Sequence, residues 1–208
     1  MKDSRMNKQF AFTSLLIFLS LFITGCYMPR DFDAFLQIDK YGRMQFDYDG
    51  RLMSVNLLKK IGNKELENQA DYEAAVDAQI RDLRRSSGFS LIQHHRDADF
   101  LVKYSYQQNL ITNPNYIFIT RASRLFKIVR NNKDQVSISS IRPNKKYLQE
   151  LQDNGFTTTG TIRVKTNAKI LSQDADSVEQ TDDQATILTW NIDSLIDDKA
   201  KIILQLGE

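Results

Sequence analysis

Apolar and polar residues alternate along much of this chain, which is the pattern of half-buried β-strands. Alternation runs over 34–38 and again over 44–48, and a glycine-containing turn at 40–42 separates the two runs. These segments predict a β-hairpin. Asp49-Gly50 is a second turn signal, so we expect a third strand over 52–58.

The segment 63–87 has a different pattern and predicts the longest helix of the chain. It is rich in Ala, Glu, Gln and Leu, and its larger apolar residues recur at spacings of four, four and three: Tyr72, Val76, Ile80 and Leu83. Such spacing places them in one stripe of an amphipathic helix. Asn63 is the expected N-cap, and Gly88 is expected to end the helix.

The rest of the chain is again rich in strand patterns. Apolar or alternating runs predict strands at 89–92, 98–106, 116–120, 124–130, 135–141, 157–166, 185–192 and 200–206. A polar turn is expected at 94–97, an exposed hairpin loop at 173–184, and a short helix between Pro143 and Gly155. The order of elements predicts a single α+β domain, with one long and one short helix packed on a predominantly antiparallel, curved sheet.

The first 26 residues differ in composition from everything that follows. Basic residues at positions 2, 5 and 8 precede an uncharged apolar run of 14 residues over 10–23. This is the arrangement of a secretory signal peptide. As a helix the run spans about 21 Å, which is shorter than the roughly 30 Å hydrocarbon core of a bilayer, so a cleaved signal is favoured over a transmembrane anchor.

The signal ends in Ile23-Thr24-Gly25-Cys26, and Cys26 is the only cysteine of the chain. This tetrapeptide resembles the lipobox of bacterial lipoproteins. The resemblance implies cleavage between Gly25 and Cys26, a diacylglyceryl group on the Cys26 thiol, and a further acyl chain, such as palmitate, on its new amino group. The alternative is an ordinary secretory signal that is cut elsewhere, which leaves Cys26 unmodified.

The resemblance also implies a division of the chain and a location. Residues 1–25 are the expected lipoprotein signal peptide, 26–32 the lipid anchor and a short tether, and 33–208 the single α+β domain. Tyr27 stands where lipoproteins retained in an inner membrane often carry Asp. The expected location is therefore the cell envelope, on the outer membrane facing the periplasm if the organism is Gram-negative.

Charge excludes one class of partner. The whole chain has a net charge of +2, and residues 1–25 contain three basic residues and one acidic residue, so the remaining 183 residues contain 25 of each sign. A neutral domain offers no electrostatic basis for binding nucleic acid. It also offers no polybasic attraction to a membrane, so attachment is expected to depend on lipid at Cys26.

Residues that could perform catalysis gather at one place, the segment 94–99. His94, Asp97 and Asp99 are the candidates for a metal-dependent or hydrolytic site, and the alternative is a polar turn ahead of a strand. The chain has no HExxH, GxSxG, Walker-type or GxGxxG motif. We therefore expect no catalytic residues, no metal site and no cofactor.

A group of aromatic residues follows on the next predicted strands: Tyr104, Tyr106, Tyr116 and Phe118. Aromatic side chains on strands line pockets for apolar or lipid ligands in some proteins. They form core and cross-strand pairs in many others. Both interpretations stay open from the sequence alone.

The C-terminal third contains a glycine-bearing strand, an Asn-Ala turn, a Thr-Trp strand and a hydrophobic end strand, at residues 159–164, 166–168, 188–192 and 202–204. This pattern resembles the tail of LppM-type bacterial lipoprotein domains, and the turn at 39–42 is also similar. The resemblance implies an envelope α+β domain that binds lipid or glycolipid and has no catalytic residues to transfer.

Three functions follow from these observations. The first is a non-catalytic, lipid-anchored envelope lipoprotein that binds an apolar or lipid ligand or an envelope protein partner. The second is an envelope hydrolase or metal-dependent enzyme that uses His94, Asp97 and Asp99. The third is a structural lipoprotein of a surface or secretion assembly.

Overall fold

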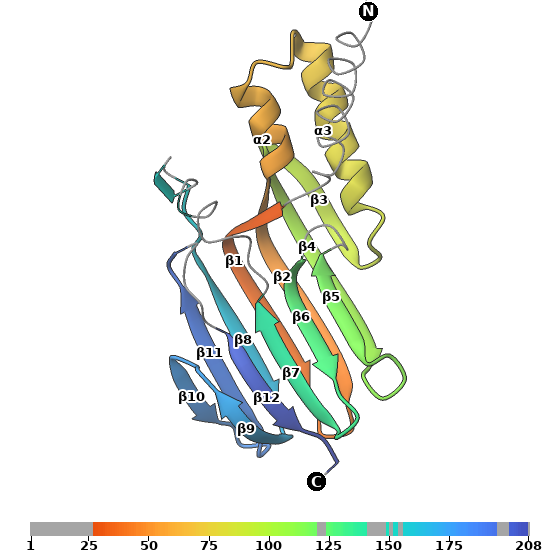
Figure 1. Ribbon diagram of the computed structural model, residues 1–208, viewed down its shortest axis with the longest axis vertical. Coiled ribbons are helices and arrows are strands. Elements are labelled where there is room, and N and C mark those ends of the chain that lie inside the picture. The colour runs from red at the N-terminus through yellow and green to blue at the C-terminus, as the bar shows by residue number, and fades with distance from the viewer. Residues whose placement is uncertain are drawn as a thin grey trace, which may run out of the picture.

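The described part of the protein consists of two β-sheets that face each other and two helices, α2 (Val55–Gly62) and α3 (Gln69–Leu83), at one end of them (Figure 1). The structure is a computed structural model that describes residues 27–119, 124–140, 149, 152–153, 156–194 and 200–207. It confirms the predicted α+β class. The strands form two sheets instead of the one curved sheet that we expected, and core side chains come from both.

The larger sheet has seven strands in the order β10-β11-β8-β1-β2-β4-β3, and the smaller has five in the order β5-β6-β7-β12-β9. The larger contains β1 (Tyr27–Ile38), β2 (Arg43–Ser54), β3 (Phe89–Arg96), β4 (Asp99–Asn109), β8 (Gly160–Thr166), β10 (Ser177–Gln180) and β11 (Thr186–Ile192). The smaller contains β5 (Asn115–Ile119), β6 (Arg124–Arg130), β7 (Gln135–Ser140), β9 (Lys169–Gln173) and β12 (Lys201–Gln205). Neighbouring strands are antiparallel except β1 and β8, which are parallel.

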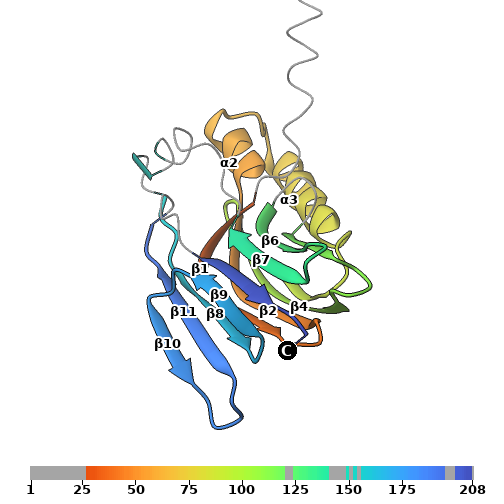
Figure 2. The ribbon, with the colours of Figure 1, turned by 60° about the horizontal axis from the view of Figure 1, so that its bottom comes forward.

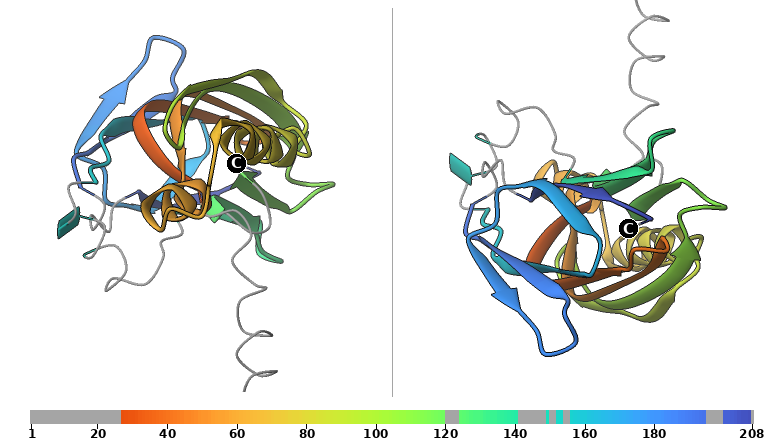
Figure 3. Two further views of the ribbon diagram at one scale, coloured as in Figure 1. Left: turned by 90° about the horizontal axis from the view of Figure 1, so that it is seen from above. Right: turned by 90° about the horizontal axis from the view of Figure 1, so that it is seen from below.

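Along the described strands, the chain changes sheet five times, from β4 to β5, β7 to β8, β8 to β9, β9 to β10 and β11 to β12. Views along the molecule show the two sheets facing each other (Figure 3). The β10–β11 hairpin projects beyond the smaller sheet (Figure 2), and all four residues of β10 are exposed. The loop expected at 173–184 therefore contains a short edge strand, because β10 pairs with β11.

The first hairpin is confirmed, but the turn expected at Asp49-Gly50 is wrong. Both residues lie inside β2, where Gly50 pairs with Val102 of β4. A Cβ atom at Gly50 would lie 2.6 Å from the Cα of Phe32. Glycine is needed here because the backbone of β1 approaches closely, which the dipeptide pattern did not distinguish from a turn.

The strand expected at 52–58 is also wrong. Strand β2 continues to Ser54, and the first helix, α2 (Val55–Gly62), begins directly after it. The buried Ser54 hydroxyl accepts a hydrogen bond from the backbone N–H of Leu57 and caps this helix. A short apolar run such as 52–58 fits a strand and a helix equally, so periodicity alone did not separate them.

The long helix is confirmed as α3 (Gln69–Leu83), with a later start than predicted. Its N-cap is Asn68, whose side chain accepts from the N–H of Asp71, while Asn63 ends α2. Of the predicted stripe, Val76 and Leu83 are buried, whereas Tyr72 and Ile80 are half-buried. The short helix expected between 143 and 155 falls almost entirely outside the described residues.

Residues 27–32, which we expected to be a tether, form the first half of β1. Tyr27 pairs with Ser54 of β2 and is only 1% exposed, and Met28 and Phe32 are also buried. Apolar side chains with a partner strand do not remain in solution as a flexible linker. Tyr27, the residue that follows Cys26, is therefore already part of the sheet.

Candidate functional site

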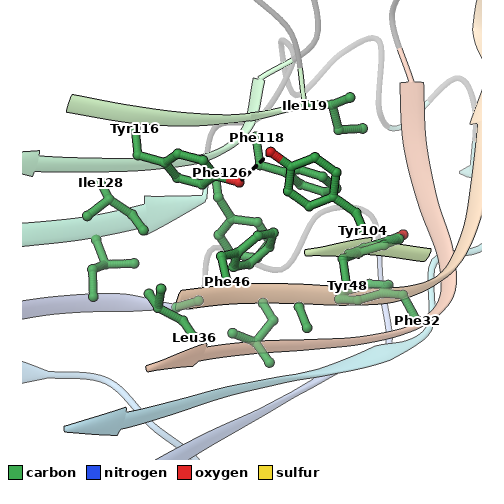
Figure 4. Close-up of a cluster of buried hydrophobic side chains, with 14 of the residues drawn as sticks. Phe32, Leu36, Phe46, Tyr48, Tyr104, Tyr116, Phe118, Ile119, Phe126 and Ile128 are labelled. Atoms are coloured by element: carbon green, nitrogen blue, oxygen red, sulfur yellow. Dashed lines mark hydrogen bonds between the residues drawn. The ribbon is translucent and has the colours of Figure 1, made fainter. Parts of the chain in front are cut away.

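Of the aromatic residues singled out in the sequence, Tyr104, Tyr116 and Phe118 come together between the sheets (Figure 4), and the Tyr106 ring stacks on that of Tyr116. Tyr104, Tyr116 and Phe118 are buried, and Tyr106 is half-buried. With Phe46 of β2 they form a group that we call the aromatic cluster.

The rings of the aromatic cluster contact one another directly. The ring centroids of Phe46 and Phe118 are 4.9 Å apart, and those of Tyr106 and Tyr116 are stacked at 5.3 Å. The Tyr116 hydroxyl donates to the Tyr104 hydroxyl over 3.3 Å. Burial raises the pKa of both phenols above their ordinary value. The rings occupy core positions, and a ligand at this place would have to displace them, so the pocket role remains a prediction.

A cavity lies next to this cluster, between the middles of the two sheets. Its lining is entirely apolar: Ala34, Leu36, Phe46, Phe126, Ile128, Ile138, Ile162, Val164, Trp190, Ala200 and Ile202. Its free volume is about 10 Å³, which is room for one water molecule at most. The lining suits an apolar ligand, but a ligand of any size requires the sheets or side chains to move.

The outer face of the larger sheet has a shallow groove of about 280 Å³ that the sequence analysis did not identify. Three carboxylates line it. Asp49 binds Lys103 at 2.9 Å and Asp33 binds Arg163 at 2.5 Å, while Asp47 accepts a hydrogen bond from the Gln45 amide over 2.8 Å. Asp33 and Asp49 are direct cross-strand neighbours, so the two cations offset a like-charge contact. The groove is therefore a paired polar surface.

The residues proposed for catalysis do not form one group, because His94 and Asp97 lie together while Asp99 has a different partner. The Nε2 atom of His94 lies 3.0 Å from the Tyr72 hydroxyl of α3 and 3.1 Å from the carbonyl oxygen of Asp97, and its ring contacts Phe100. Asp97 occupies the turn between β3 and β4 with a φ of 49°. These contacts hold α3 against the β3–β4 hairpin.

Asp99 is 5% exposed and forms an ion pair with Arg30 of β1 at 3.2 Å. It follows Ala98 and precedes Phe100, and successive strand side chains point to opposite faces. Because Phe100 shares its face with His94, Asp99 points away from that histidine. Among the described residues, no group of three or more His, Cys, Asp or Glu side chains could hold a metal ion.

Cys26 and the cleavage position lie outside the described residues, and the residue that follows them, Tyr27, lies in β1. The Tyr27 hydroxyl lies 3.2 Å from both the Gln79 Oε1 and the Asp82 Oδ2 of α3. Burial, reinforced by Asp82, raises the pKa of Tyr27 well above its ordinary value. In the part of the chain that the structure describes, no helix is sufficiently long and apolar to cross a membrane.

Comparison with known proteins gives similarities to solved structures only. No family model and no curated protein matches the chain. The NMR structure of the folded domain of LppM from Mycobacterium tuberculosis is similar, with a TM-score of 0.44 and 11% identity over 91% of this chain and 95% of that domain. A likeness of this size assigns neither a family nor a function.

Proposed function

We propose that this protein is a non-catalytic lipoprotein of the bacterial cell envelope, anchored through acylated Cys26. The observation that carries the proposal is the position of the only cysteine. It ends a lipobox-like tetrapeptide, and the next residue, Tyr27, is already buried in the fold. Signal, modification position and folded domain therefore follow one another without a gap.

The strength of such an anchor depends on the number of acyl chains. Each buried methylene contributes about 0.8 kcal/mol, so one chain holds a protein only marginally and two or three hold it firmly. The domain after Gly25 carries equal numbers of basic and acidic residues. Membrane attachment in this proposal comes from the lipid, with the outer membrane as the expected destination if the organism is Gram-negative.

For the bound molecule, the apolar lining of the cavity between the sheets favours an apolar or lipid ligand, which requires the sheets or side chains to move because the free volume is only about 10 Å³. Ala34 and Ala200 are the smallest side chains of this lining. A protein partner is the other form of the proposal. The exposed edge strand β10, with Val178 on its surface, supports that form.

The enzyme hypothesis has less support. His94 and Asp99 have different partners on different faces of the sheet, so the three candidate residues do not form one site. Replacement of His94 and Asp97 with Ala is the discriminating test. Loss of a hydrolytic activity or of bound metal in a folded variant would favour the enzyme.

The anchor is tested by growing cells with a clickable palmitate analogue and comparing the wild type with Cys26→Ser. We expect label on the wild type only, and a variant that migrates as the longer, uncleaved chain. Thr24→Ser is the matched control, because it keeps a small residue before the cleavage position and should be labelled like the wild type. Label on Cys26→Ser, or none on the wild type, would overturn the proposal.

A further inference from the structure

The two facing sheets form a sandwich, and its two ends differ in the elements that cover them. Tyr27, the first described residue, lies at one of these ends. Helices α2 and α3 and the connecting residues 63–68 cover that end, and we call these elements the helical cap (Figure 1). The tip of the β1–β2 hairpin, at 39–42, lies at the other end. We infer that the helical cap lies against the lipid bilayer surface, an inference that rests on the proposed anchor at Cys26.

The first support is that no linker residue separates Cys26, the anchored position, from Tyr27, the first residue of the sheet. Consecutive Cα atoms are about 3.8 Å apart, so the Cα of Cys26 lies within about 4 Å of that of Tyr27. Three features fix the position of Tyr27. Its backbone pairs with Ser54 of β2, its side chain is buried, and its hydroxyl contacts Gln79 and Asp82 of α3. An anchor attached here holds this end of the domain at the membrane.

The second support is where the cap begins. Ser54, the strand partner of Tyr27, is also the N-cap of α2. Helix α2 therefore starts beside the anchored residue and leads to the connection 63–68, which the ribbon places at the extreme end of the described domain (Figure 1). Leu58, Ile61 and Leu66 each pack against the core there and are half-buried, so part of each side chain stays exposed.

The charges of the cap indicate what kind of lipid contact to expect. The helical cap, residues 55–83, contains four basic and six acidic side chains, and Arg84 and Arg85 follow it directly. A surface without an excess of positive charge gains little from anionic head groups. The cap therefore fits a bilayer surface through its anchor and its half-buried apolar side chains, and zwitterionic lipid is sufficient.

The end with the β1–β2 hairpin is the control for the proposed orientation, because it also has exposed apolar side chains. Tyr41 is 61% exposed and Ile111 is 48% exposed. Strand β1 has 12 residues, so at about 3.3 Å per residue this end lies about 40 Å from Tyr27. A membrane at the helical cap leaves Tyr41 in water.

The test uses the full chain, purified with its lipid and reconstituted in phosphatidylcholine vesicles containing a head-group nitroxide quencher. A fluorophore is attached at Ala70→Cys in the cap or at Tyr41→Cys in the hairpin, since both native residues are exposed and an acylated Cys26 thiol does not react. We expect several-fold stronger quenching at position 70 than at position 41.

Equal quenching at the two positions, or stronger quenching at 41, would overturn the orientation if the mass of the protein shows an acylated Cys26. A free Cys26 thiol would instead overturn the proposed anchor, and the orientation with it. The mass measured on the same sample thus separates the two failures.

Discussion

The sandwich and the helical cap differ in how much of their surface is buried. Phe46, Phe118 and Trp190 come from three different strands, and all three are completely or almost completely buried between the sheets. In α3, only Val76 and Leu83 of 15 residues are buried. Burial of apolar surface is the main source of folding free energy, so the sandwich supplies the stability and the cap adds little to it.

This difference separates stability from function within one domain. An element that contributes little to folding can have exposed or half-exposed side chains selected for contact with another surface. The cap is such an element, and the anchored residue Tyr27 lies where it meets the sandwich. Four experiments test the comparison.

The largest effect is expected in the sandwich, from Trp190→Ala. The indole is buried, and its Nε1–H donates to the Asp174 carboxylate, which also accepts from the N–H of Lys201. Loss of a buried Trp costs about 3–5 kcal/mol in free energy of unfolding. Urea denaturation measures it, with Trp190→Phe as a milder control. A loss below about 1 kcal/mol would contradict a sandwich-based stability.

Substitution of one glycine in the sandwich and of one in the helical cap compares the two regions directly. A Cβ at Gly160 of β8 would lie 2.4 Å from the Phe32 ring and 2.6 Å from its carbonyl oxygen, so Gly160→Ala is expected to cost about 1–3 kcal/mol. At Gly62 of α2 a Cβ meets nothing within 4 Å, and Gly62→Ala is expected to stabilise by about 0.5–1 kcal/mol. Thermal unfolding of both variants should shift the midpoint in opposite directions, and a shift of the same sign would contradict this contrast.

Alkaline pH should also weaken the sandwich. The ordinary phenol pKa is 10.0, and burial raises those of Tyr104 and Tyr116 in the folded state. Above pH 10 the unfolded chain loses these protons while the folded protein retains them, so stability is complete below that pH and falls above it. Tyr116→Phe should reduce the slope of unfolding free energy against pH above 10. An unchanged slope would show that the aromatic cluster does not hold these protons.

The smallest effect is expected in the cap, from Tyr72→Phe. This removes the hydroxyl contacts with His94 and with the carbonyl oxygen of Asp97, and it keeps the ring. A typical hydrogen bond contributes about 1 kcal/mol, and less at a partly exposed position. Hydrogen exchange should become faster in α3 and stay unchanged in β1, β2 and β8. Faster exchange throughout the sheets would mean that cap and sandwich unfold as one unit.

The sequence predicted those elements whose pattern has one physical explanation. Alternation over 98–106 and the stripe through Val76 and Leu83 were confirmed as β4 and α3. The errors fell where one pattern has two explanations. Gly50 marks a close backbone approach instead of a turn, and the apolar run 52–58 is divided between a strand and a helix.

Contacts between strands that are far apart in the sequence could not be predicted from the sequence. The Arg30–Asp99 and Asp33–Arg163 pairs join residues 69 and 130 positions apart, and only the strand order brings them together. The lipobox-like tetrapeptide is different, because its signal is local. What the structure adds to Cys26 is its nearest neighbour, a buried Tyr27 where a tether was expected.

The most direct test of a lipid anchor joined to this fold is the mass of the N-terminal tryptic peptide from membrane-extracted protein. Cleavage after Arg30 should release Cys26–Arg30, five residues that carry a diacylglyceryl group, with or without a further acyl chain. A chain that retains residues 1–25, or one that begins at Cys26 with a free thiol, would contradict the account.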